Sequence, residues 1–276
     1  MMTEMKALYV LLTATALACM TACSVREDRG GCPAWITVCS DGYVADGYEG
    51  ELQFNLSTEL RSIFNRAEYP LSEFEHKGSL VFEVPRAEKV FVDIFGGVSR
   101  MRNRSAGLLI ARGDCCDSIY AGHADAFIDG DEGMAAIPLN KSFANLRIHV
   151  INNTDDMERL SDFKFVIHGD VDGYCIPGGA PHKGIFEYTP DVGEDSEYLS
   201  ARLPRQLNSS LTMDVLISSD GSMLTDIPLG ELIANMDYDW SEPDLEDIRL
   251  EIKLEPTAFT LTIEGWGKTE TIYIDL

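Results

Sequence analysis

The stretch Asp247-Ile-Arg-Leu-Glu-Ile-Lys-Leu-Glu255 decides the fold class of this chain. Apolar and charged residues alternate along it, and this period of two is typical of a strand with one buried face and one solvated face. The alternation resumes over 259–263 and again over 271–276, with Gly265-Trp266-Gly267-Lys268 between them. The C-terminal end of the sequence therefore predicts three consecutive strands.

The same period of two continues through the rest of the chain. Alternating segments lie at 90–94, 146–150 and 213–217, with shorter candidates at 35–39, 51–56, 80–84, 108–110, 163–167 and 198–203. Many short strands separated by Gly, Pro and Asp are typical of β-sandwiches. We therefore expect an all-β protein.

Helix signals are few. Ser57 is a residue type that caps helices, and we expect it to start a short helix over Thr58–Phe64. Asp226 and Pro228 form a second start signal, for a helix over Leu229–Met236.

Charge and length bound the function. The 276 residues carry 22 Lys and Arg against 46 Asp and Glu, which gives a net charge of −24. Nucleic acid is not an expected partner, because phosphate binding depends on Lys and Arg. The apolar fraction of 45% is that of a folded protein. The length favours two domains, and a boundary near Asn140 divides the chain into two segments of sandwich size.

The first 22 residues are expected to be a signal peptide. Lys6 precedes an apolar run, Ala7–Ala18, that is too short to span a bilayer as a helix. The small residues Thr21-Ala22 then precede Cys23, and this arrangement resembles the lipobox of bacterial lipoproteins. The resemblance implies that the Cys23 thiol receives a diacylglycerol. Lipidation at Cys19, or an ordinary signal peptide, is the alternative.

Lipidation of Cys23 predicts a membrane-anchored protein with a soluble body. Acyl chains contribute about 0.8 kcal/mol per buried CH₂, so several chains hold a protein firmly on a membrane. The lipidated linker would cover 23–33. Within it, Arg26-Glu27-Asp28-Arg29 resembles the charged tract that some lipoproteins use for display on the outer surface, and a solvated linker is the alternative.

Five other cysteines are expected in the mature chain: Cys32, Cys39, Cys115, Cys116 and Cys175. An odd number leaves at least one thiol free or paired between chains. If the stretch from Cys32 to Cys39 is extended, its ends lie roughly 23 Å apart, beyond the roughly 7 Å reach of a disulfide. No C-x-x-C pair occurs, so a metal site is not expected.

Motifs for catalysis are absent from the sequence. The chain has no G-x-S-x-G, H-E-x-x-H, G-x-G-x-x-G or P-loop pattern. The acidic stretches Asp129–Gly133 and Asp170–Gly173 lack the ligand ladder of a calcium loop, and we expect them to be turns. We expect no enzyme activity, no small-molecule substrate and no cofactor besides the diacylglycerol and acyl lipid on Cys23.

Three segments carry a resemblance to a known family: Gly31–Val38, Ile137–Ile148 and Phe259–Trp266. With the lipobox and the charged tract, they resemble the fimbrillin-associated anchor lipoproteins of type V pili. The resemblance implies two tandem transthyretin-like β-sandwich domains, over 34–140 and 141–276, and a lipid anchor in the outer membrane. It also implies a role in tethering or terminating a fimbrium through contact with its pilin subunits.

The chain departs from the family by continuing past Trp266 with an amphipathic strand. Pilins of this class assemble by strand exchange, and an unpaired sheet edge offers backbone donors and acceptors for such pairing. The candidate partner-binding residues are therefore those of the last strand: Thr271, Ile272, Tyr273, Ile274, Asp275 and Leu276. The alternative is a hairpin that folds back onto 259–263, since strands linked by a turn usually pair.

A surface glycan-binding lipoprotein with tandem β-sandwich modules is the alternative function. Such a protein would stack sugars on exposed aromatic side chains, and the candidates are Tyr174, Tyr188, Tyr238 and Trp240. An anchor instead needs an apolar groove for a strand.

Overall fold

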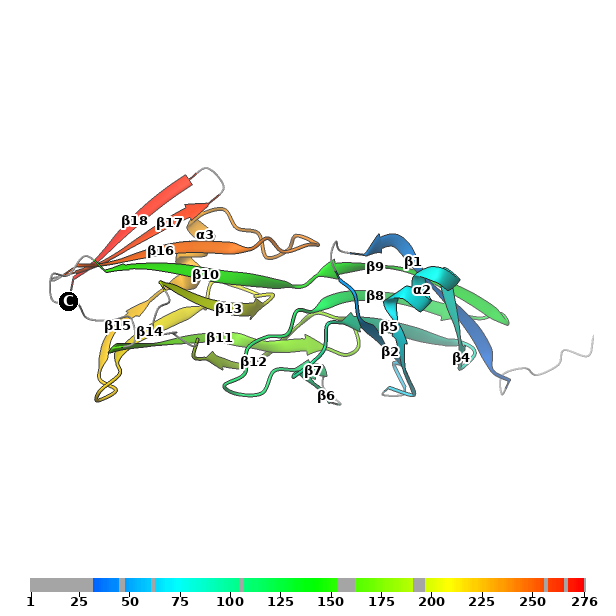
Figure 1. Cartoon of the computed structure of the whole chain (residues 1–276). Coiled ribbons are helices and arrows are strands. Elements are labelled where there is room, and N and C mark those ends of the chain that lie inside the picture. The colour runs from blue at the N-terminus through cyan, green and yellow to red at the C-terminus, as the bar shows by residue number, and fades with distance from the viewer. Residues whose placement is uncertain are drawn as a thin grey trace, which may run out of the picture.

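The alternating sequence pattern forms strands throughout the chain, as a computed structural model shows. The structure describes residues 32–44, 48–60, 63–104, 107–152, 162–190, 197–255, 258–265 and 268–275. These residues form three sheets and two short helices, which confirms the all-β prediction (Figure 1). No helix within them is long and apolar enough to cross a membrane.

The first sheet has seven strands. Their order is β3 (Asn65–Pro70), β2 (Glu51–Thr58), β5 (Glu88–Gly96), β8 (Tyr120–Ile128), β9 (Glu132–Lys141), β1 (Ala34–Val44) and β4 (Ser79–Val84). β1 and β9 run parallel, whereas the other neighbours run antiparallel. The short connection between β8 and β9 is formed by Asp129-Gly130-Asp131, so the first acidic stretch turns the chain as expected.

This sheet folds over onto itself. Phe54 of β2 and Phe82 of β4 stand near opposite ends of the strand order, yet their ring centroids are 5.5 Å apart. Helix α2 (Leu71–Lys77) connects β3 to β4 and packs Phe74 edge-on against Phe54, again at 5.5 Å. Aromatic pairs of this geometry add about 0.5–1.5 kcal/mol beyond their area burial. Gly78 ends the helix in the left-handed conformation, with φ of 71°.

Two further sheets form the rest of the molecule. One has the order β13 (Tyr198–Pro204), β10 (Phe143–Asn152), β16 (Ile248–Glu255), β17 (Ala258–Gly265) and β18 (Lys268–Asp275). The other has the order β15 (Met223–Ile227), β14 (Thr212–Ile217), β11 (Phe163–Cys175), β7 (Gly107–Leu109) and β6 (Arg102–Arg104), with β12 (Pro181–Tyr188) also paired to β11. Ile148 of β10 and Phe165 of β11 share one buried core, so the two sheets pack face to face.

The short strands β6 and β7 link the two halves of the sequence. They precede Asn140 in the chain, yet β7 pairs with β11, with Leu109 opposite Gly173. Phe95 and Met101 accordingly belong to the buried core of the later strands. The chain therefore leaves the first sheet after β5, adds a hairpin to another sheet, and returns to the first sheet at β8 (Figure 1).

One predicted helix forms and the other does not. Helix α3 (Leu229–Asn235) matches the expected Leu229–Met236, although its N-cap is Pro228 and Asp226 belongs to β15. The helix predicted over Thr58–Phe64 is wrong. Ser57 and Thr58 continue β2 opposite Phe91 and Val90 of β5, so the strand ladder takes the backbone that a helix cap would need.

The second acidic stretch is also not a turn. Asp170–Gly173 lies inside the long strand β11, whose pairing with β12 shifts register on either side of Val171. Such bulges let a strand pass through Asp- and Gly-rich sequence without ending.

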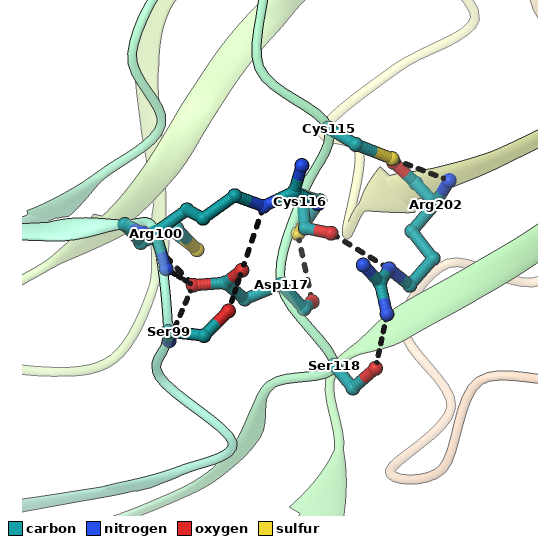
Figure 2. Close-up of polar contacts among 8 residues, drawn as sticks. Ser99, Arg100, Cys115, Cys116, Asp117, Ser118 and Arg202 are labelled. Carbon is teal, nitrogen blue, oxygen red and sulfur yellow. Dashed lines mark hydrogen bonds and ion pairs between the residues drawn. The ribbon is translucent and has the colours of Figure 1, made fainter. Parts of the chain in front are cut away.

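The segment that returns from β7 to β8 is fastened to β13 by Arg202 (Figure 2). Arg202 donates from Nε to the carbonyl of Cys116 at 2.9 Å and from Nη1 to the hydroxyl of Ser118 at 2.8 Å. The backbone N–H of Arg202 also donates to the Cys115 sulfur at 3.0 Å. The side chain and backbone of Arg202 thus hold three positions of the returning segment, at residues 115, 116 and 118.

Asp117 anchors the same segment from within (Figure 2). Its carboxylate is fully buried and accepts hydrogen bonds at 2.7–2.8 Å from the backbone N–H groups of Ser99, Arg100 and Met101. The Ser99 hydroxyl adds a fourth hydrogen bond at 2.6 Å. Burial by itself would raise the pKa of Asp117, but these hydrogen bonds outweigh it and hold the pKa below its ordinary value.

The five described cysteines are all free: Cys32, Cys39, Cys115, Cys116 and Cys175. The prediction that Cys32 and Cys39 do not pair with each other is confirmed. Burial raises the pKa of the Cys116 thiol well above its ordinary value, so this cysteine is a packing residue rather than a nucleophile.

Candidate protein-interaction edge

The last strand lies at the edge of its sheet. β18 ends the order β13-β10-β16-β17-β18, and its only neighbour among the described strands is β17. The two strands pair antiparallel from Gly265 opposite Lys268 to Ala258 opposite Asp275. The structure therefore has the hairpin that was the alternative to an open exchangeable strand, and the other edge of β18 has no strand partner within the described residues.

The predicted partner-binding residues belong to this edge strand. Thr271, Ile272, Tyr273, Ile274 and Asp275 lie in β18, whereas Leu276 lies outside the described residues. The register places apolar residues opposite apolar ones, Ile272 with Leu261 and Ile274 with Phe259. Cys23, the predicted lipidation site, also lies outside the described residues.

Several other edges of the described sheets are short or interrupted. β6 has three residues and β15 has five. β3, β12 and β13 each carry a proline at one end: Pro70, Pro181 and Pro204. Short strands and prolines discourage pairing with a further strand. β18 instead offers eight residues without Pro or Gly, with Ile272-Tyr273-Ile274 near its middle.

Three histidines on strands, His123, His168 and His182, lie within hydrogen-bond distance of carboxylates of neighbouring strands. His123 Nδ1 lies 2.8 Å from Asp93 Oδ1, and His182 Nδ1 lies 2.6 Å from Asp172 Oδ1. No cluster of three or more His, Cys, Asp or Glu side chains that could hold a metal ion occurs within the described ranges.

The four aromatic candidates for sugar stacking do not form one face. Tyr174 is fully buried and its hydroxyl donates to the carbonyl of Ser142, so its assignment to an exposed platform is wrong. The reason is its position on β11, whose residues at this point face the core. Tyr188 lies on β12, away from the other two in sequence. Only Tyr238 and Trp240 come together, with ring centroids 4.7 Å apart.

Solved structures share this fold. A candidate polysaccharide-binding protein from Bacteroides thetaiotaomicron superposes with a TM-score of 0.62 at 10% identity, over 87% of this chain and 98% of that one. A candidate adhesin from Bacteroides ovatus gives 0.61 at 10% identity, over 87% and 95%. The fimbrial anchor protein Mfa2 from Porphyromonas gingivalis gives 0.58 at 10% identity, over 88% and 99%.

The likeness to these structures lies in the fold. No protein-family model and no curated protein matches the sequence. The chain thus shares its fold over most of its length with a candidate adhesin and a fimbrial anchor protein, at a sequence identity of only 10%.

Proposed function

We propose that this protein is a lipid-anchored subunit that tethers or terminates a fimbrium at the bacterial outer membrane, and that it pairs with a pilin subunit through β18. The shared fold with a fimbrial anchor protein and an adhesin candidate supports a fimbria-related role at the cell surface. The single observation that carries the proposal is the eight-residue edge strand β18. The role needs no catalytic site.

An added strand is a strong means of attachment. Main-chain hydrogen bonds along an edge supply affinity, and alternate side chains supply specificity. The hairpin allows two routes for such pairing. A pilin strand adds to the free edge of β18, or β18 leaves β17 and inserts into the pilin.

The arrangement of the molecule suits an anchor. The described chain begins at Cys32, soon after the predicted lipidation site Cys23. β1 starts at one end of the elongated molecule, and the β17–β18 hairpin lies at the opposite end (Figure 1). A lipid on Cys23 would therefore hold the first sheet near the membrane and leave β18 pointing away from it.

Co-purification with sheared fimbriae tests the proposal. Tagged protein should be recovered with fimbriae from the same cells, and deletion of residues 269–276 should abolish recovery. Recovery of the deleted protein at the wild-type level would overturn the role of β18. Thermal melting of both proteins shows whether the deletion leaves the body folded.

A disulfide lock separates the two routes without removing the strand. Thr262 and Thr271 are opposite each other in the β17–β18 ladder, so the pair Thr262→Cys and Thr271→Cys can bridge the hairpin. If β18 must leave β17, the oxidised protein loses fimbriae and reduction restores them. If a pilin strand adds to the free edge, the oxidised and reduced proteins bind alike.

A further inference from the structure

Beyond the fimbrial role, the molecule has a groove whose lining residues all lie outside the β17–β18 hairpin. The groove has a volume of about 630 Å³ and lies between the loop after β13, helix α3 and the loop that follows α3. Its lining includes Pro181, Leu207, Ala234 and Trp240. Ligand sites in proteins are typically concave, about 300–1,000 Å³, with an apolar lining and a few placed polar groups.

Arg205 fixes the wall of the groove that carries Trp240. Its guanidinium donates to the backbone carbonyls of Trp240, Glu242 and Pro243, the last two at 2.7 and 2.8 Å. Asp239 begins the same loop and accepts hydrogen bonds from the backbone and hydroxyl of Ser241, both at 2.7 Å. The loop is thus held in one shape before any ligand arrives, which lowers the cost of binding.

Tyr238 and Trp240 form an aromatic pair in which the Tyr238 ring supports the Trp240 ring. Tyr238 and Trp240 pack edge to face, with an interplanar angle of 67°. The Tyr238 hydroxyl donates to the carbonyl of Glu246 at 2.8 Å, which holds this ring behind the loop. Trp240 is half-buried, and its indole N–H has no hydrogen-bond acceptor within the described residues. An aromatic face with a free donor at its edge suits a ligand that is apolar on one side and polar on the other.

Gln206 forms part of the floor of the groove. Its side chain lines the groove and is only 3% exposed. Nε2 donates to the carbonyl of Pro204 at 2.7 Å, whereas Oε1 has no partner. Because Oε1 is fully buried, Gln206 shapes the floor of the groove and does not itself contact a ligand.

Charge selects among ligands that carry hydroxyl groups. The net charge of −24 repels acidic polymers. The Arg205 guanidinium faces backbone carbonyls, and Asp239 is the other charged residue of the lining, so the groove offers no unengaged cation to an anionic ligand. We propose that this groove binds a sugar ring of a neutral polysaccharide, with Trp240 as the stacking surface and its indole N–H as a donor to a sugar oxygen. The proposal does not depend on the fimbrial role.

Affinity electrophoresis of the mature chain tests the groove. Native gels would contain a neutral mannan, glucan or galactan, and alginate would serve as the anionic polymer. We expect retardation by at least one neutral polysaccharide and none by alginate. Trp240→Ala should weaken the apparent affinity at least tenfold, whereas Trp35→Ala, which removes a 45% exposed tryptophan from β1, should leave it unchanged.

A second variant keeps the test decisive if Trp240→Ala disturbs folding. Ala234 is an exposed residue of α3 that lines the groove, and Ala234→Gln fills the space with a good helix former. It should reduce retardation to the same extent without changing the melting temperature. No retardation by any neutral polysaccharide, retardation by alginate only, or equal retardation of wild type and Ala234→Gln would overturn the proposal. Oxidation of the β17–β18 lock should not change sugar binding, which separates this proposal from the fimbrial one.

Discussion

Arg202 of β13 donates a hydrogen bond from Nε to the carbonyl of Cys116 at 2.9 Å. Cys116 lies between β7 and β8, on the part of the chain that returns to the first sheet after pairing with β11. Because the bond joins positions 86 residues apart, it helps to hold the crossing segment in place. The two halves of the sequence are therefore connected by side-chain contacts as well as by the shared strands β6 and β7.

Arg202→Ala should destabilise the folded protein by about 1–3 kcal/mol, because it leaves the Cys116 carbonyl and the Ser118 hydroxyl without their donor. Urea unfolding measures the change. Arg249→Ala is the matched control, since Arg249 is an exposed residue of β16 in the same sheet. Equal stability of the two variants would contradict the role given to Arg202.

The free energy of unfolding should depend on pH through the ionisation of Asp117. Its pKa is lowered in the folded state, so its contribution is complete above the unfolded value of about 3.9 and is lost as the pH falls through the lowered folded value. Asp117→Asn keeps the shape but removes the charge, and it should lower stability at pH 7 by about 1–3 kcal/mol.

Unfolding free energies between pH 7 and pH 2 check this prediction. The difference in unfolding free energy between wild type and Asp117→Asn should become smaller below about pH 4, where an ordinary Asp carboxyl becomes protonated. Asp125→Asn is a useful control, because that carboxylate is exposed and its partner Lys89 is also on the surface. A difference that stays constant over the whole pH range would mean that the Asp117 charge does not stabilise the fold.

Lipidation of Cys23 should decide where the protein is found. Cys23→Ser removes the thiol that would carry diacylglycerol, so the variant should move from the membrane fraction to the soluble fraction. The mass of the mature N-terminus checks the same point, since the wild type should begin at an acylated Cys23. Cys19→Ser is the control and should leave both results unchanged. A Cys23→Ser protein still held in the membrane fraction would contradict the predicted anchor.

The strands at the C-terminal end were predictable because apolar and polar residues alternate within each strand. Ile248, Leu250 and Ile252 are buried while the charged residues between them are not, as the period of two requires. Helix α3 was also predictable, since Pro228 marks its start. Helix α2 has only seven residues and buries two, Leu71 and Phe74, which is too short a pattern to identify.

Pairings between distant segments gave no local signal. β7 carries three residues, and nothing in Gly107–Leu109 indicates that its partner is β11 rather than a strand of the first sheet. The groove likewise gives no local signal in the sequence, because its lining comes from four separate segments, at Pro181, Gln206, Ala234 and Trp240. The sequence singled out Tyr238 and Trp240 as aromatic candidates but could not distinguish them from Tyr174, which the register of β11 turns into the core.

Amide hydrogen exchange of β18 tests the central claim most directly. The purified protein is measured alone and with fimbrial subunits from the same cells, and β4, an edge strand of the first sheet, serves as the internal control. If β18 pairs with a subunit, exchange over residues 268–275 should slow at least tenfold in the complex, while exchange over Ser79–Val84 stays the same. A complex that forms with no change of exchange in β18 would contradict the claim.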